Sequence, residues 1–74
     1  MRKVRVNRVY RHFKGNTYKV RALATHSTTE EVMVIYSNTR NGRLWVRPYN
    51  EFLSEVDREK YPDATQKYRF EEVK

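Results

Sequence analysis

Alternation of apolar and polar residues at every second position is the dominant pattern along this chain, and it is typical of strands with one buried face. The pattern is clearest over residues 17–26. There Tyr18, Val20, Ala22, Ala24 and His26 would share one face. The next stretch, residues 31–37, is apolar on both faces, which indicates a central strand. Together these two stretches predict the middle of a sheet.

The N-terminal part of the chain would supply the first strand of this sheet. Alternation begins at Lys3, with Val4 and Val6 on one side and Lys3 and Arg5 on the other, and it runs less regularly to Phe13. The Lys-Gly-Asn sequence at residues 14–16 predicts a turn, because glycine and asparagine tolerate positive φ. This turn would lead directly into the strand at residues 17–26.

The second half of the chain predicts shorter elements. Residues 44–47 form a fourth strand, which ends at Pro48 because proline lacks the amide hydrogen that a ladder needs. A single helical turn suits residues 49–53, the polar residues 57–66 form a loop, and a final strand covers residues 68–70. The pattern therefore predicts a mainly β fold: a small five-stranded barrel, closed or half-closed, with one short helical turn.

Length and composition narrow the class of protein. With 74 residues there is room for one domain, residues 1–74. The chain has no cysteine, which fits a reducing compartment and excludes a thiol nucleophile and cysteine-ligated zinc. No apolar run approaches the roughly 20 residues that span a bilayer, and no apolar stretch follows the basic N-terminus as in a signal peptide. We therefore expect a cytoplasmic protein with no membrane partner.

Positive charge is crowded toward the N-terminus. The net charge is +7, and residues 1–29 hold eight lysines and arginines and no acid, whereas residues 51–74 hold seven acids against five bases. Such a field attracts phosphates, nucleic acid or anionic small molecules. The charge therefore predicts a negatively charged partner, with simple solubility as the alternative reading.

Several motifs resemble one known family. They are Tyr-Arg-His-Phe-Lys-Gly at residues 10–15, Tyr18-x-Val20, Ala24-x-His26-Ser27, Glu31, Val46-Arg47-Pro48 and Phe52. The chain is similar, from about Val9 to Phe70, to the bacterial and phage family catalogued as domain of unknown function 1653. The resemblance implies an SH3-like barrel and brings no activity with it. It also leaves both a bacterial and a phage origin open, so a phage protein acting on its host is one alternative.

Catalysis and metal binding find little support in the residues. Only His12 and His26 could supply imidazole, and no compact spacing such as H-E-x-x-H is present, so we expect neither a metal site nor a cofactor. His26 and Ser27 are neighbours, and neighbouring residues of a strand point to opposite faces. A Ser–His pair is therefore not expected, and we expect that the protein is not an enzyme.

Three binding functions remain as hypotheses. The first is a pocket for an anionic or nucleotide-like small ligand, in which cationic groups would bind the anion and aromatic rings would stack. Its candidate residues are Tyr10, His12, Lys14, His26, Ser27, Trp45 and Arg47. The second is nucleic-acid binding by a basic N-terminal strand bearing Lys3, Arg5, Arg8 and Arg11. The third is a protein-interaction module, for example a homo-oligomer that associates through exposed aromatic residues.

Overall fold

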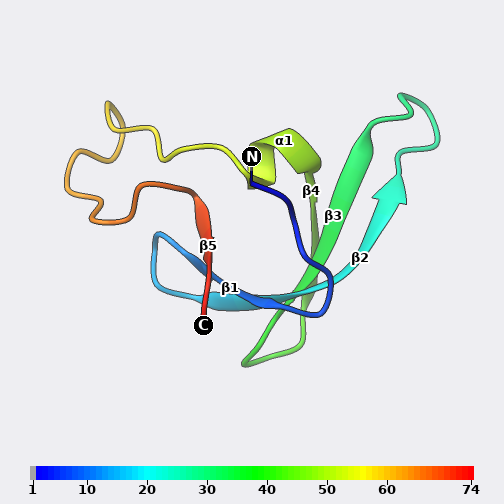
Figure 1. The fold of residues 1–74 in the computed structure, drawn as a ribbon, viewed down its shortest axis with the longest axis horizontal. Helices are drawn as coiled ribbons and strands as arrows, with labels where there is room; N and C mark the ends of the chain where they lie inside the picture. The colour runs from blue at the N-terminus through cyan, green and yellow to red at the C-terminus, as the bar shows by residue number, and fades with distance from the viewer. Residues whose placement is uncertain (1) are drawn as a thin grey trace.

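One curved antiparallel sheet with a short helix makes up the structure, a computed structural model that describes residues 2–74 (Figure 1). The elements in chain order are β1 (Val9–His12), β2 (Thr17–Thr25), β3 (Val32–Asn38), β4 (Leu44–Pro48), α1 (Tyr49–Phe52) and β5 (Phe70–Glu72). In space the strands lie in the order β4-β3-β2-β1-β5, so the last strand pairs with the first. The predicted mainly β fold, with five strands and one short helical turn, is confirmed.

The sheet curls but does not close. Strands β4 and β5 lie at its two ends, and within residues 2–74 neither pairs with the other. The half-closed form of the predicted arrangement is therefore the observed one, and a closed barrel is not. The concave side of the sheet holds the core, with α1 packed over it against β3 and β4 (Figure 1).

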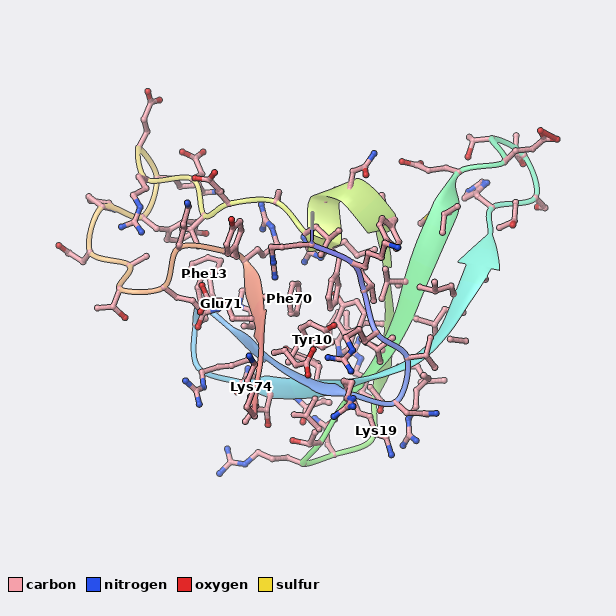
Figure 2. The ribbon with its side chains drawn as sticks, viewed as in Figure 1. Tyr10, Phe13, Lys19, Phe70, Glu71 and Lys74 are labelled. Atoms are coloured by element: carbon pink, nitrogen blue, oxygen red, sulfur yellow. The ribbon has the colours of Figure 1, made fainter. Side chains whose placement is uncertain are left out.

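The core is mainly aromatic. Phe70 of β5 and Phe52 of α1 are stacked with ring centroids 4.1 Å apart, and Tyr10 and Tyr36 meet Phe52 edge-on. Figure 2 shows Tyr10 and Phe70 in the space between the sheet and α1. Val20 and Val34 complete the buried inner face. A short chain with few residues to bury thus fills its core with large rings, each of which removes much apolar area from water.

A β-bulge at Arg21 divides β2 and reverses its faces. The register passes from Val20 opposite Tyr36 to Ala22 opposite Ile35, so Arg21 is an extra residue. Its Nε donates to the buried Ser37 Oγ at 2.9 Å. Beyond the bulge Ala22 and Ala24 face outward. The prediction that they share a face with Tyr18 and Val20 was wrong, because strict alternation cannot anticipate an inserted residue.

The N-terminal segment is not part of the first strand. Residues 2–8 precede β1 as a separate connection, and Asn7 has a left-handed φ of 72°. Asn7 still donates its amide to Val20 O, and Arg8 O accepts from the Val20 amide. The predicted strand from Lys3 to Arg8 was wrong, because the turn at Asn7 redirects the chain across the core, where Val4 is buried.

The last strand lies slightly later than predicted. Tyr68 makes only an isolated bridge to Glu55, and β5 covers Phe70–Glu72 rather than residues 68–70. The Tyr68 amide donates to the Glu71 carboxylate, and the Arg2 guanidinium lies 3.8 Å from the Tyr68 ring. Alternation assigned Tyr68 to the strand, but these side-chain contacts hold it before the strand begins.

Candidate functional site

Tyr10 belongs to the core rather than to a ligand pocket. Its side chain is 2% exposed, and its hydroxyl accepts the Arg5 amide at 2.9 Å. Burial is the main cause that raises the pKa of Tyr10 above its usual value. The residue anchors the N-terminal segment to β1, and its ring has no free face to offer a ligand.

His12 lies at the edge of the core as a neutral imidazole. Its ring centroid is 4.5 Å from that of Phe13 and 4.8 Å from that of Phe70. Burial, reinforced by the nearby charges of Arg47, Arg69 and Lys14, lowers the pKa of His12 to about 4. The Nδ1 atom accepts the Lys14 amide at 3.2 Å, so the proton of the neutral ring is on Nε2. His12 therefore shapes the turn that presents Lys14.

Arg47 ties the helix to the sheet. Its Nη1 forms an ion pair with Glu51 Oε1 at 2.7 Å, and its Nε donates to the Tyr36 hydroxyl at 3.3 Å. The guanidinium also lies 5.7 Å from the Phe70 ring. The structure thus brings Arg47 and His12 to the same inner face around Phe70, and Arg47 has two of its donors occupied there.

His26 and Ser27 lie at the tip of the hairpin that joins β2 and β3, which projects away from the β1–β2 turn (Figure 1). His26 Nδ1 accepts the amides of Thr28 and Thr29 at 3.1 and 3.3 Å. These bonds hold a tight turn whose last residue, Glu30, has a φ of 62°. The structure therefore does not bring this pair together with His12 and Arg47.

Trp45 stands on β4, the strand at the open edge of the sheet. Its side chain is 41% exposed, and the Arg43 guanidinium lies 4.5 Å from its ring. It is opposite Tyr36 in the register, on the concave face. Trp45 is therefore accessible, but it is separate from the turn that carries Lys14.

Lys14 lines a pocket that the sequence did not reveal. A cavity of about 350 Å³ lies between the β1–β2 turn and the loop that precedes β5, and we call it the turn–loop pocket. It is lined by Phe13, Lys14, Lys60, Tyr61, Pro62, Asp63 and Ala64. The turn with Phe13 lies beneath this loop in Figure 2. Sequence reasoning assigned residues 57–66 to a polar loop and missed Lys60 and Tyr61; the one signal was an aromatic Tyr-Pro pair inside a polar stretch.

Rings and amines converge in the turn–loop pocket. The Phe13 and Tyr61 rings meet edge-to-face with centroids 4.9 Å apart. The Lys14 and Lys60 Nζ atoms lie 5.1 and 5.7 Å from the centre of the Tyr61 ring. Two cations beside one aromatic ring suit an anion that carries a flat group, because the amines bind charge and the ring stacks.

Hydrogen bonds within the loop fix its side of the pocket. The Asp57 carbonyl accepts the Tyr61 amide at 2.8 Å, and the Arg58 Nη1 donates to Ala64 O at 2.7 Å. Gln66 Nε2 donates to Arg11 O at 2.8 Å and so ties the loop to β1. These bonds hold the loop in place against the β1–β2 turn.

Comparison with known proteins identifies the family. The matching family model is described as "Protein of unknown function (DUF1653)", and the match covers residues 8–72. The chain belongs to this family. Both sides of the turn–loop pocket lie within the residues that match DUF1653. Searches of the curated proteins and of the solved structures gave no match.

The N-terminal cations of this DUF1653 protein do not form one stripe. Lys3 and Arg5 lie outside any strand, and Arg5 pairs with Glu72 at 3.5 Å. Arg11 is on the outer face of β1, opposite Glu71 in the register, and Arg8 is exposed. Lys3, Arg5 and Arg8 therefore precede the first strand, and Arg11 alone of the four lies on it.

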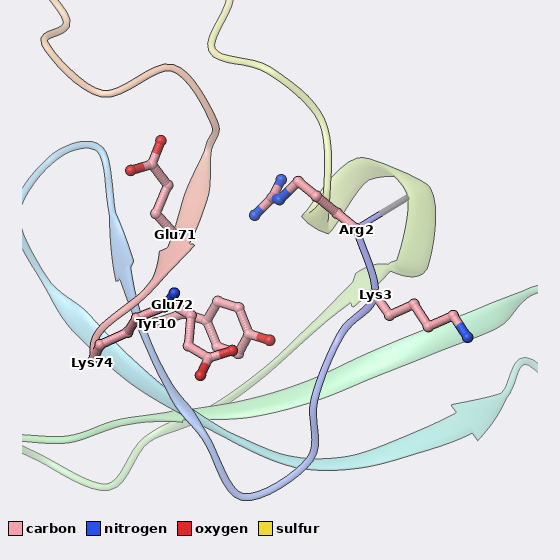
Figure 3. Close-up of a pocket in the computed structure, with 6 residues that line it drawn as sticks. All are labelled: Arg2, Lys3, Tyr10, Glu71, Glu72 and Lys74. Atoms are coloured by element: carbon pink, nitrogen blue, oxygen red, sulfur yellow. The ribbon is translucent and has the colours of Figure 1, made fainter.

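A second cavity, of about 240 Å³, lies beside the N-terminal segment (Figure 3). Arg2 and Lys3 line one side, Glu71, Glu72 and Lys74 line the other, and Tyr10 lies between them. Arg2 is already engaged, since it donates to Leu53 O and Phe70 O. This cavity has two carboxylates in its lining, against one in the turn–loop pocket, and one of its cations is already engaged, so it suits an anion less well.

Among residues 2–74, no group of three or more His, Cys, Asp or Glu side chains is arranged to hold a metal ion. In the same part of the chain, no helix is long and apolar enough to cross a membrane.

Proposed function

We propose that this protein is a non-catalytic binding module that captures a small anionic, nucleotide-like ligand in the turn–loop pocket. The observation that carries the proposal is the convergence of the Lys14 and Lys60 amines on the Tyr61 ring inside a cavity. A volume of about 350 Å³ falls within the range of pockets that hold small molecules.

Each group of the pocket has a role in this proposal. The ammonium groups of Lys14 and Lys60 bind phosphate or carboxylate oxygens, and the Tyr61 ring stacks on the flat part of the ligand. Asp63, also in the lining, accepts a hydrogen bond from a hydroxyl or amino group of the ligand. His12 acts indirectly, because its Nδ1 holds the amide of Lys14 in place.

The proposal leaves catalysis out because of what lines the pocket. Acyl or phosphoryl transfer needs a nucleophile beside a base that can activate it. The lining has two amines, one carboxylate and no serine, cysteine or histidine. The proposal therefore assigns these amines and this carboxylate to binding a charged ligand.

A thermal-shift experiment tests the proposal. Nucleotides at a hundred times their Kd should stabilise the protein by about 2.7 kcal/mol, which raises Tm by roughly 10–20 °C in a domain this small. The substitutions Lys14→Gln and Lys60→Gln should each reduce the shift, and together they should abolish it. Tyr61→Leu should leave the response to inorganic tripolyphosphate and weaken the response to nucleotides, because only the stacking surface is lost.

The matched control is Lys19→Gln, which removes one positive charge on the outer face of β2, away from the pocket. The shift should survive this change. If no nucleotide or phosphorylated metabolite raises Tm, or if Lys19→Gln lowers the shift as much as Lys60→Gln, the pocket does not bind the ligand proposed.

A further inference from the structure

The open edge of the sheet at β4 is the most exposed apolar part of the fold. Leu44, Trp45 and Val46 are consecutive, and their side chains are 63%, 41% and 59% exposed. Strand β4 pairs with β3 on one side, and within residues 2–74 no strand pairs with its other side. Proteins normally protect such an edge with charge, a bulge or a covering segment, because it can accept another strand.

The register shows which backbone groups are free at this edge. The Asn38 amide donates to Arg43 O, and bonded pairs alternate along an antiparallel ladder. Trp45 and Arg47 therefore bond to β3, whereas the amide and carbonyl groups of Leu44 and Val46 point outward. Pro48 has no amide hydrogen, so it ends the free edge. Two residues can thus form four backbone hydrogen bonds with an added strand.

Side chains divide this edge into two chemically different faces. Trp45 and Arg47 lie on the concave face, with the Arg43 guanidinium 4.5 Å from the Trp45 ring, whereas Leu44 and Val46 lie on the convex face. Residues 32–50 hold three arginines and no acid. Arg47 is paired with Glu51, while Arg43 contacts the Trp45 ring and, among residues 2–74, no carboxylate. An added strand is complementary if it places an acidic residue beside Arg43 and aliphatic residues beside Leu44 and Val46.

Charge argues against a second copy of this chain as the occupant. If two β4 strands paired antiparallel about Trp45, Arg43 of each copy would face Arg47 of the other. Like charges directly opposite each other destabilise a strand pair, and two chains of net charge +7 repel at long range. An acidic partner has neither penalty.

We propose that β4 is a docking edge for an extended segment of a partner protein in which acidic and aliphatic residues alternate, added as a sixth strand. Backbone bonds to Leu44 and Val46 supply the geometry of this β-augmentation. Arg43 selects the charge of the segment. The site is distinct from the turn–loop pocket and does not depend on the function proposed for it.

Trp45 provides the measurement, because it is the only tryptophan in the chain. Its fluorescence would be titrated with short peptides that alternate valine with glutamate, and with matched peptides that alternate valine with lysine. We expect a saturable change with the acidic peptide and binding about tenfold tighter than with the basic one. In Arg43→Glu the order of the two peptides should reverse. The order of the two peptides should not reverse in Lys19→Glu, which makes the same charge change on the outer face of β2.

Val46→Pro tests the backbone part of the proposal. It removes an outward amide that β3 does not use, so the sheet should stay folded by circular dichroism. We expect peptide binding to weaken about tenfold. The proposal is overturned if neither peptide gives a saturable change, or if Arg43→Glu leaves the preference for acid intact. Dimers of the free protein that Val46→Pro dissociates would also overturn it, since the edge would then serve self-association.

Discussion

The two halves of β2 continue one alternating pattern along the chain but have very different surroundings. Before the bulge, Tyr18 packs edge-on against Tyr36 and Phe70, and Val20 is fully buried. After the bulge, Leu23 faces the concave side opposite the buried Val34 but is itself 42% exposed, and Val32 across the hairpin is 44% exposed. The same strand therefore forms the floor of the core at one end and a projecting arm at the other.

Strand pairing and side-chain burial therefore do not extend over the same residues of the sheet. The β2–β3 hairpin is long and well paired throughout. Burial ends near Val34, because the core rings of Phe52 and Phe70 pack on Tyr36. The arm is held by its ladder, whereas the other end is held by packed rings.

The strongest test of this contrast compares one residue from each region. Phe70→Ala removes a side chain that is 1% exposed and touches the rings of Phe52, Tyr36, Tyr18 and His12. We expect a loss of about 3–5 kcal/mol in the free energy of unfolding, enough to unfold much of the protein. Leu23→Ala in the arm should cost about 1 kcal/mol or less. Urea unfolding followed by circular dichroism measures both, and equal losses would contradict the division.

A pH titration tests the core end of the sheet, because His12 lies at the edge of the core. The pKa of His12 is lowered from 6.5 to about 4 in the folded protein, so the unfolded chain binds more protons between these values. The stability that His12 contributes is therefore complete above about pH 6.5 and is lost as the pH falls toward 4. Between pH 7 and pH 5 we expect a loss of about 1 kcal/mol, after allowing for solvent screening.

The matched variant for this titration is His12→Asn. Its side-chain oxygen can still accept the Lys14 amide, as asparagine does in turns, but it does not titrate. The fall in Tm between pH 7 and pH 5 should be smaller in this variant. An unchanged fall would place the titrating group elsewhere.

The smallest expected effect lies at the tip of the arm. Glu30 has a left-handed φ of 62°, which costs a residue with a Cβ about 1 kcal/mol or more. Glu30→Gly relieves this strain and adds backbone entropy to the unfolded chain, so we expect a net gain of about 0.5 kcal/mol. Asn7→Gly, at a φ of 72° near the core, should gain less because asparagine tolerates this conformation. Differences in the urea midpoint would rank the two, and a larger gain at Asn7 would contradict this account.

Much of the fold could be predicted from the sequence, and the errors have physical causes. Alternation predicted β2, β3 and β4 closely, and Gly15 takes the positive φ of 109° that the predicted turn needs. It failed at Arg21 and Asn7, where an inserted residue and a left-handed residue change the direction of the backbone. The pattern of apolar and polar positions does not show either residue's effect, because each effect is a change in backbone geometry.

The candidate site was harder to predict than the fold. Pattern and charge pointed to Lys14, which does line the turn–loop pocket, and to His12, which holds its amide. They also grouped His26 with these residues, because nothing in the sequence shows that the β2–β3 hairpin projects away from the β1–β2 turn. Tyr61 was missed because the loop meets Phe13 only through long-range folding.

The position of Phe70 in the chain has a consequence for how the protein is made. The Phe70 ring, at the centre of the core, comes from β5. This strand pairs with β1, which lies near the opposite end of the sequence. While the ribosome is still synthesising the first four strands, their inner faces have nothing to pack against, and closing so long a loop is slow. The nascent chain therefore exposes part of its aromatic core until residues 70–72 have left the exit tunnel, and exposed apolar surface of this kind is prone to aggregation.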